Sequence, residues 1–135
     1  MAEPHFTRVV FFEQSLRRLE EALAKPEDPI VRDACIQRFE FTFEMAWKAV
    51  QSYALAEGVE CVSPRDCFRT AFRLGLVESD ARWMAMVEDR NRTSHTYDEE
   101  IAQTIYRALP GYMDLLGNLL EKLKAGEIRR AHEEA

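Results

Sequence analysis

The residues best suited to chemistry lie in one polar stretch, residues 88–98, with the sequence EDRNRTSHTYD. It contains no aliphatic side chain, so it cannot belong to the core of a chain that is 47% hydrophobic. His95 is the titratable candidate, because an imidazole can accept and release a proton near neutral pH. Arg90 could bind a phosphate and balance the charge that develops during phosphoryl transfer. The other histidines, His5 and His132, lie near the chain ends, so we expect only His95 to be held in a fixed geometry.

The relative direction of Arg90 and His95 depends on where the helix that carries them ends. On a continuous helix of 3.6 residues per turn, the two side chains would point about 140° apart. Thr93 and Ser94 are weak helix formers and allow an end between them. We therefore expect the helix to end between Arg90 and His95 if the two act on one substrate.

The alternative interpretation of this stretch is a polar turn between two helices. In that case Glu88 pairs with Arg92, and His95 bonds a backbone carbonyl. With fourteen arginines in the chain, an Arg at this spacing before a given His is expected by chance roughly three times in ten, so the spacing alone is a weak signal. The residues alone leave both interpretations open.

Length, composition and charge indicate one intracellular domain. A chain of 135 residues with this hydrophobic content can bury one core. No stretch approaches the roughly 18 apolar residues of a membrane span, and no export signal is recognisable, so we expect a cytoplasmic protein with no membrane contact. The net charge of −6 argues against broad adhesion to nucleic acid, because Lys and Arg neutralise phosphates. Any RNA site must therefore be local.

The cysteines predict neither a disulfide framework nor a metal site. Cys35, Cys61 and Cys67 make an odd number in a chain without an export signal. Cys61 and Cys67 lack the spacing of a zinc finger, and no histidine lies near them in the sequence. We expect three buried free thiols, no metal and no cofactor.

Apolar residues at steps of three and four predict helices joined by short turns. The first helix should stop before Pro26. A long second helix begins at the cap Asp28 and runs to about Ala56, where Gly58 can end it. A short third helix begins at the cap Ser63.

The third helix should close at Gly75, and a fourth opens at Ser79 or Asp80. The last helix begins at Asp98 and runs to about Gly126. This pattern predicts an all-α chain that packs as a helical bundle. The residues beyond Gly126 are charged, and we expect them to fray as a tail.

Three cations line up on the third predicted helix. Arg65, Arg69 and Arg73 are four residues apart, so they share one face of the helix. Such a face can simply be solvated. It can also contact an RNA backbone or an acidic partner, and the sequence leaves these alternatives open.

The second predicted helix carries more apolar surface than one four-helix packing needs. A stripe that includes Phe39 and Phe43 faces one way, and Phe41, Met45 and Trp47 widen it. Surplus apolar surface of this kind marks interfaces. We therefore expect a homodimer, with the polar stretch at or near its interface.

Two segments resemble a known family. The string RNRTSHTY, from Arg90 to Tyr97, matches the Arg-x4–6-His signature of HEPN domains in its Arg-x4-His-x-Tyr form. Residues 38–48, RFEFTFEMAWK, look like the long second helix of the branch called nucleotidyltransferase substrate-binding proteins. With the helix order, the resemblance covers roughly residues 5–124.

The resemblance implies a HEPN-like fold and a domain plan. The fold is an up-and-down antiparallel four-helix bundle with an additional short helix, and it dimerises. One domain occupies residues 1–135, with its core at about residues 5–124 and a charged flexible tail at residues 125–135.

The resemblance also implies the toxin of a toxin–antitoxin pair that cleaves RNA without a metal. The ribose hydroxyl attacks its own phosphate and leaves a cyclic phosphate end. Arg90 and His95 are the implied catalytic residues, contributed by both subunits, and Asn91 and Arg92 support phosphate binding. The implied partner is a separate minimal nucleotidyltransferase (MNT), an antitoxin that transfers AMP to Tyr97.

The alternative function is a non-catalytic subunit that presents a nucleotide or substrate to a two-component nucleotidyltransferase. Both functions need the same bundle and the same interface, so the helices do not discriminate between them. Growth arrest on expressing this chain alone would fit only the ribonuclease.

Overall fold

The computed structural model describes residues 4–78 and 80–134. Within these ranges every regular element is a helix, which confirms the predicted all-α class. The elements are α1 Pro4–Leu23, α2 Pro29–Ala56, α3 Pro64–Arg73, α4 Asp80–Arg92, the 3₁₀ turn η1 Thr93–His95, and α5 Glu99–Glu134. None of the described helices has the length and hydropathy to cross a membrane.

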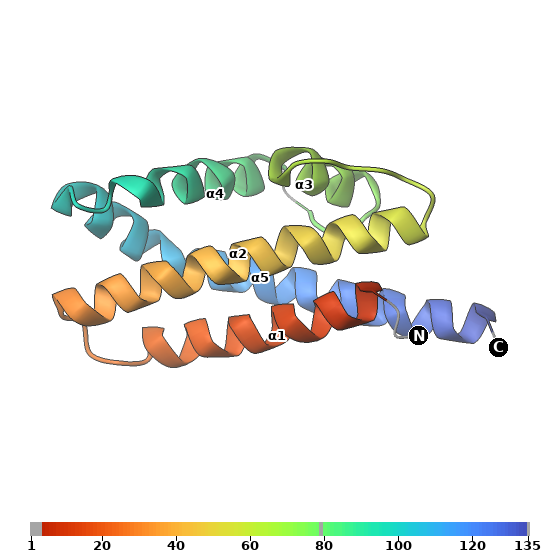
Figure 1. Ribbon diagram of the computed structural model, residues 1–135, viewed down its shortest axis with the longest axis horizontal. Coiled ribbons are helices and arrows are strands. Elements are labelled where there is room, and N and C mark those ends of the chain that lie inside the picture. The colour runs from red at the N-terminus through yellow and green to blue at the C-terminus, as the bar shows by residue number, and fades with distance from the viewer. Residues whose placement is uncertain (1–3, 79, 135) are drawn as a thin grey trace.

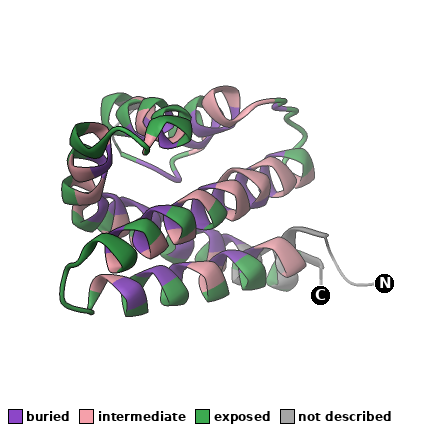
Figure 2. Cartoon of the chain, turned by 60° about the vertical axis from the view of Figure 1, so that its left-hand side comes forward, coloured by how far each residue is buried: buried purple, intermediate pink, exposed green. Residues whose placement is uncertain are grey.

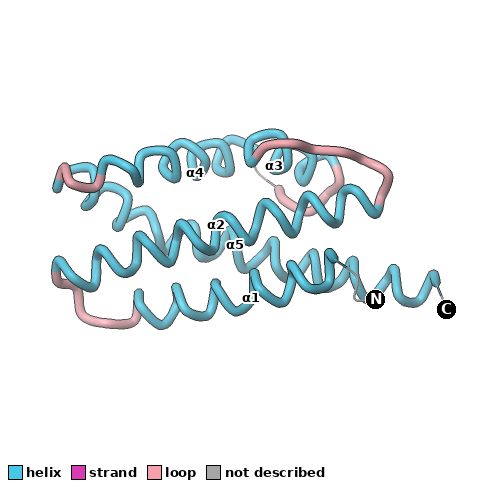
Figure 3. Tube along the Cα trace, in the orientation of Figure 1, coloured by secondary structure: helices cyan, strands magenta, loops and turns pink. Residues whose placement is uncertain are grey.

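The four long helices α1, α2, α4 and α5 form an up-and-down antiparallel bundle, with α3 as the additional short helix (Figure 1). The connections that join α1 to α2 and α4 to α5 lie at the same end of the molecule (Figure 3). The longer connection from α2 to α3 lies at the other end. The polar stretch of residues 88–98 therefore sits at the end where α2 begins.

Side-chain caps begin three of the helices where the sequence predicts them. Asp28 accepts a hydrogen bond from the Val31 amide at 2.8 Å, and Ser63 accepts one from the Asp66 amide at 3.2 Å. Each of these caps precedes a proline at the first helical position. Asp98 accepts from amides in the first turn of α5. These caps fix the N-terminal ends of α2, α3 and α5.

Two glycines close helices in the left-handed region. Gly58 has φ of 85° and Gly75 has φ of 77°, values that side chains with a Cβ resist. Both ends agree with the sequence. The helix α4 begins at Asp80, and the other predicted start, Ser79, lies outside the described residues.

Aromatic side chains join three helices in the core, which faces inward in Figure 2. Phe43 of α2 contacts Phe68 of α3, with ring centroids 5.5 Å apart. Phe68 in turn contacts Trp83 of α4 at 4.6 Å. All three rings are fully buried. Large buried rings supply much of the apolar area that stabilises a core, so this chain of contacts anchors α3 and α4 on α2.

The expectation of three free thiols is wrong for two of the cysteines. Cys61 and Cys67 form a disulfide, whereas Cys35 is free and buried. The chain turns at the Ser63 cap of α3 and brings the Cα atoms of the pair within 5.0 Å, a normal disulfide separation. This proximity arises from the turn, which a count of cysteines does not reveal.

The last helix is longer than predicted. α5 passes Gly126 without a break and continues to Glu134. A Cβ at Gly126 would lie 2.5 Å from the Tyr53 ring, so glycine here allows α5 to pack closely on α2. Arg129 then donates to the Tyr53 hydroxyl at 3.2 Å and to Glu57 at 2.6 Å. The predicted helix end at Gly126 is therefore a packing position inside α5.

Candidate functional site

The site forms where α4 ends, at the left-hand end of the molecule in Figure 1. α4 stops at Arg92, and η1 carries the chain to His95. The Thr93 hydroxyl donates to the Arg90 carbonyl at 2.7 Å, and Arg90 Nη1 donates to Thr93 Oγ1 at 3.2 Å. Thr93 is buried, so it fixes this end. The helix thus ends between Arg90 and His95, as their joint action requires.

Arg90 is held against α2. Its Nη1 lies 3.7 Å from a carboxylate oxygen of Glu40, and its Nη2 lies 3.6 Å from one of Glu44. The guanidinium carbon lies 6.0 Å from the centre of the Phe43 ring, at the limit of a cation–π contact. Trp47 Nε1 donates to Glu44 at 3.1 Å and orients that carboxylate. Two acids and one ring therefore position the cation, with 27% of its side chain exposed.

His95 and Tyr97 form an exposed pair. His95 Nδ1 lies 3.3 Å from the Tyr97 hydroxyl, and the two rings meet edge to face. Tyr97 is 85% exposed, so its hydroxyl is open to a modifying enzyme. The pair gives the imidazole a polar neighbour and leaves it exposed to solvent.

The structure does not contain the two contacts that the polar-turn interpretation predicts. Arg92 Nη1 pairs with Asp89 at 3.3 Å and not with Glu88. The His95 ring meets the Tyr97 hydroxyl, in place of the backbone carbonyl that this alternative expects.

Asp89 ties α4 to α5. It accepts a short hydrogen bond from the Tyr112 hydroxyl and also contacts Arg92. Burial, together with this bond, raises the pKa of the Tyr112 phenol well above its usual range. Asp89 and Tyr112 are therefore structural residues that fix the helix end beneath the site. Asn91 is exposed, and its backbone carbonyl accepts a hydrogen bond from the Ser94 hydroxyl at 3.2 Å.

A hollow of about 460 Å³ lies between α2 and the chain that follows η1. Glu40, which contacts Arg90, lines it from α2, and Tyr97 lines it from the other side. Asp33 and Gln37 add polar groups on the same face of α2. No hydrogen bond or ion pair between described residues joins Arg90 directly to His95. Arg90 and His95 do not line the hollow themselves; Arg90 is next to it through Glu40, and His95 through Tyr97.

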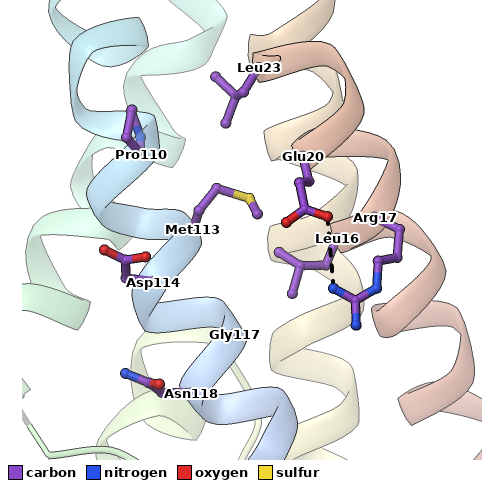
Figure 4. Close-up of a pocket in the computed structure, with 9 residues that line it drawn as sticks. All are labelled: Leu16, Arg17, Glu20, Leu23, Pro110, Met113, Asp114, Gly117 and Asn118. Carbon is purple, nitrogen blue, oxygen red and sulfur yellow. Dashed lines mark ion pairs between the residues drawn. The ribbon is translucent and has the colours of Figure 1, made fainter.

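A second hollow lies between α1 and α5, and no residue of the polar stretch lines it (Figure 4). It measures about 740 Å³. Met113 points into it from α5 and Leu23 from α1, and Arg17 pairs with Glu20 across one side at 3.9 Å. It offers no histidine, cysteine or hydroxyl group for catalysis. The polar stretch, which holds His95, therefore remains the candidate site. No cluster of side chains suited to a metal ion occurs among the described residues.

Sequence reasoning did not identify Glu40 and Glu44 as part of the site. They lie about fifty positions before Arg90 in the chain and meet it only because α4 packs on α2. Their spacing of four residues places both on one helix face, which was a visible signal. The cation that they face could not be recognised from that spacing.

A family model described as "Nucleotidyltransferase substrate binding protein like" matches residues 7–125. The chain belongs to this family. It is also 32% identical over 103 residues to a Haemophilus influenzae protein named "Probable ribonuclease HepT", an alignment that covers 73% of this chain and 70% of the relative. These matches confirm the HEPN membership that the motif suggested.

Solved structures share the fold. A Thermus thermophilus protein is 41% identical, with a TM-score of 0.79, covering 83% of this chain and 98% of that one. A Haemophilus influenzae structure, described as revealing the fold of a nucleotidyltransferase substrate-binding domain, is 25% identical with a TM-score of 0.78, covering 86% and 98%. A tri-AMPylated Shewanella oneidensis HEPN toxin, solved in complex with an MNT antitoxin, is 15% identical with a TM-score of 0.74, covering 93% and 99%. The last likeness concerns the fold alone.

Proposed function

We propose that the protein is the toxin of a two-component pair, a metal-independent endoribonuclease that an MNT antitoxin neutralises. The observation that carries this proposal is that Arg90 and the His95–Tyr97 pair lie at the same end of α4, beside a polar hollow that Glu40 and Tyr97 line. The likeness to a relative named as a probable ribonuclease supports it. We further propose that it acts in the cytoplasm, where its RNA substrate would be found.

In the proposed reaction the ribose 2′-hydroxyl attacks the adjacent phosphorus. The bond from phosphorus to the 5′-oxygen breaks, which leaves a 2′,3′-cyclic phosphate and a free 5′-hydroxyl. His95 removes the proton from the attacking hydroxyl or gives one to the leaving oxygen. Arg90 balances the charge that builds on the phosphate oxygens, and Asn91 and Arg92 would bind neighbouring phosphates.

A homodimer would complete this chemistry. One imidazole cannot serve as base and acid in the same step, whereas two subunits supply two. Phe41 of α2 is 57% exposed and Phe11 of α1 is 50% exposed, and both line a hollow on the outer α1–α2 face. Phe41 directly follows Glu40, which contacts Arg90. Pairing of two chains through this face would bring the two sites together.

Tyr97 is the proposed point of control. Its hydroxyl would attack the α-phosphorus of ATP on the MNT partner, release pyrophosphate and carry AMP. The added phosphate would stand beside His95, because the two side chains already touch. It would also attract Arg90 and repel the RNA backbone. Modification would then block the site without unfolding the bundle.

The second candidate function is a non-catalytic subunit that binds the substrate of a nucleotidyltransferase. The two acids beside Arg90 favour it, because they already neutralise the cation that the ribonuclease would use. Expression of the chain alone distinguishes the functions. The ribonuclease predicts growth arrest by the parent and by His132→Ala, and none by His95→Ala. Arrest by His95→Ala at equal protein level, or no arrest by the parent, would favour the binding subunit.

A further inference from the structure

The outer face of α3 carries three arginines without acidic partners among the described residues. Arg69 and Arg73 are exposed, and neither forms an ion pair with a described carboxylate. Arg65 is half-buried and directs Nη1 to the Met84 sulfur of α4 at 3.7 Å. This set of residues, the α3 arginine row, is unusual in a chain with a net charge of −6.

Five other arginines of the described chain pair with a carboxylate, namely Arg17, Arg32, Arg90, Arg92 and Arg129. Arg38 and Arg107 do not, and each donates instead to a neutral oxygen. The α3 arginine row differs from these two because its three members share one face of one helix. An anionic ligand would supply the acidic partner that the row lacks among the described residues.

The spacing and surroundings of the row suit a nucleic acid strand. Residues four apart on a helix rise by about 6 Å, a separation similar to that of successive phosphates along an extended strand. Arg binds phosphate with a planar fork of donors. Phe72 is 46% exposed and lies two helical turns from Arg65, on nearly the same side of α3. Exposed rings among cations are the pattern of single-strand binding, because bases stack on them.

The row also lies in line with the catalytic candidates. α3 and α4 occupy the same side of the molecule, and the contact of Arg65 with Met84 joins their ends (Figure 1). α4 then leads to Arg92 at the site. Its 13 residues span about 20 Å, so several nucleotides would lie between the row and the bond that is cut.

We propose that the α3 arginine row is a second RNA-binding surface, which holds the backbone of single-stranded RNA several nucleotides away from the site. This inference rests on the proposed function for its choice of ligand. RNA is favoured over an acidic protein because Phe72 offers a ring for stacking beside evenly spaced cations. The surface would allow an acidic toxin to retain its substrate with only a local basic patch.

The test measures RNA binding in a His95→Ala background, so that RNA is not consumed. The variant is Arg69→Gln with Arg73→Gln. The matched control is Arg17→Gln with Arg107→Gln, which removes the same charge from exposed positions on α1 and α5. Affinity is measured across a range of salt for a single-stranded RNA of about 20 nucleotides and for a tetranucleotide. Thermal unfolding verifies that each variant is folded.

We expect the variant to bind the long RNA at least about tenfold more weakly than the control at low salt. The slope of log affinity against log salt should fall by about 1.4, since each lost phosphate contact on a single strand contributes about 0.7. The tetranucleotide, which is too short to reach α3, should bind variant and control alike.

Equal slopes for variant and control on the long RNA would overturn the proposal, and so would the absence of RNA binding by the control. A variant that keeps the slope but no longer binds the nucleotidyltransferase would also overturn it, in favour of a protein partner. If the parent protein binds RNA through the α3 arginine row but does not cleave it, the proposed ribonuclease activity is contradicted and the proposed RNA-binding surface is supported.

Discussion

At the scale of single residues, Arg90 must exchange partners to act. Its contacts with Glu40 and Glu44, at 3.7 Å and 3.6 Å, are longer than the roughly 2.7–2.9 Å of charge-assisted hydrogen bonds. A phosphate that makes two short bonds to the guanidinium could therefore displace them. The Phe43 ring and Thr93 would keep the side chain in place meanwhile. In the proposed reaction the two acids would therefore compete with the RNA phosphate for Arg90.

Tyr97 is predicted to be the residue that carries AMP. Co-expression with an active MNT partner should add one or more AMP groups to the parent, and none to Tyr97→Phe, as read by mass spectrometry of the modified peptide. The physical reason is exposure, since the Tyr97 ring is 85% accessible and the other tyrosines are at least partly buried. Tyr106→Phe is the matched control and should be modified like the parent.

Neutralisation is compared in the same strains. Binding by the partner could restrain the toxin without chemistry, so a catalytically dead partner measures that contribution. AMP found on another residue, or equal neutralisation of Tyr97→Phe and the parent by enzymatic modification, would refute the role of Tyr97.

Part of the site could be predicted from local sequence and part could not. Arg90, His95 and Tyr97 lie within eight residues, so their spacing and the weak helix formers between them were visible in the sequence. The acids that face Arg90 come from α2, and only the packing of α4 on α2 brings them there. Tertiary neighbours of this kind leave no spacing signal near the motif.

At the scale of helices, the bond from Tyr112 to Asp89 fastens α4 to α5. We expect Tyr112→Phe to lower the free energy of unfolding by about 2 kcal/mol, the usual worth of a hydrogen bond to a charged group. Tyr106→Phe should change the free energy of unfolding very little, because the Tyr106 hydroxyl forms no hydrogen bond with the described residues. Urea denaturation of the three proteins measures both effects, and equal loss in the two variants would refute the role of this bond.

The same bond predicts a dependence on pH. The pKa of Tyr112 is raised in the folded state by burial and by Asp89, so folding holds the phenol proton more tightly than the unfolded chain does. The stabilisation is full below the ordinary tyrosine pKa of about 10 and decreases as the pH rises above it. The stability difference between the parent and Tyr112→Phe should therefore shrink above about pH 10. A difference that grows there would contradict this sign.

Gly126 is predicted to be intolerant of any side chain. A methyl group there would lie 2.5–3.0 Å from three atoms of the Tyr53 side chain, so Gly126→Ala should cost about 1–3 kcal/mol by overpacking. Gly117 lies in the same helix with nothing within 4 Å of its added Cβ. Gly117→Ala should therefore stabilise by about 0.5–1 kcal/mol. The midpoint temperature of thermal unfolding should fall for Gly126→Ala and rise for Gly117→Ala. A shift in the same direction for both variants would contradict the packing role of Gly126.

Helix starts were predictable because caps and prolines act over a few residues. Asp28, Ser63 and Asp98 all cap where expected. The end of α5 and the Cys61–Cys67 disulfide could not be predicted, since each depends on residues that lie beside the segment only in the folded chain. From the sequence alone, Gly126 indicates a helix end. Its packing role is visible only when the Tyr53 ring is seen beside it.

At the scale of the whole molecule, the exposed aromatic face of α1 and α2 predicts a homodimer. Sedimentation at micromolar concentration should show a dimer for the parent. Phe41→Arg should give a folded monomer, because a charge would enter the apolar contact. Val62→Arg is the matched control, since Val62 is 79% exposed in the connection before α3 and away from this face. A compact monomer for the parent would contradict both the homodimer and a site shared between two subunits.

The bundle holds the motif at one end, beside the face that would meet a second chain, and the α3 arginine row lies farther along the α3–α4 side. The fold itself carries little specificity, since related bundles are described both as toxins and as a substrate-binding domain. Function must therefore be decided by the chemistry of His95 and Arg90 and not by the helices.

The most direct measurement is cleavage of single-stranded RNA by the purified protein in the presence of a chelator, with the product ends identified by mass spectrometry. We predict fragments with 2′,3′-cyclic phosphate and 5′-hydroxyl ends from the parent and from His132→Ala, and a rate at least about 100-fold lower for His95→Ala. No cleavage by the parent, or equal cleavage by His95→Ala and His132→Ala, would contradict the account.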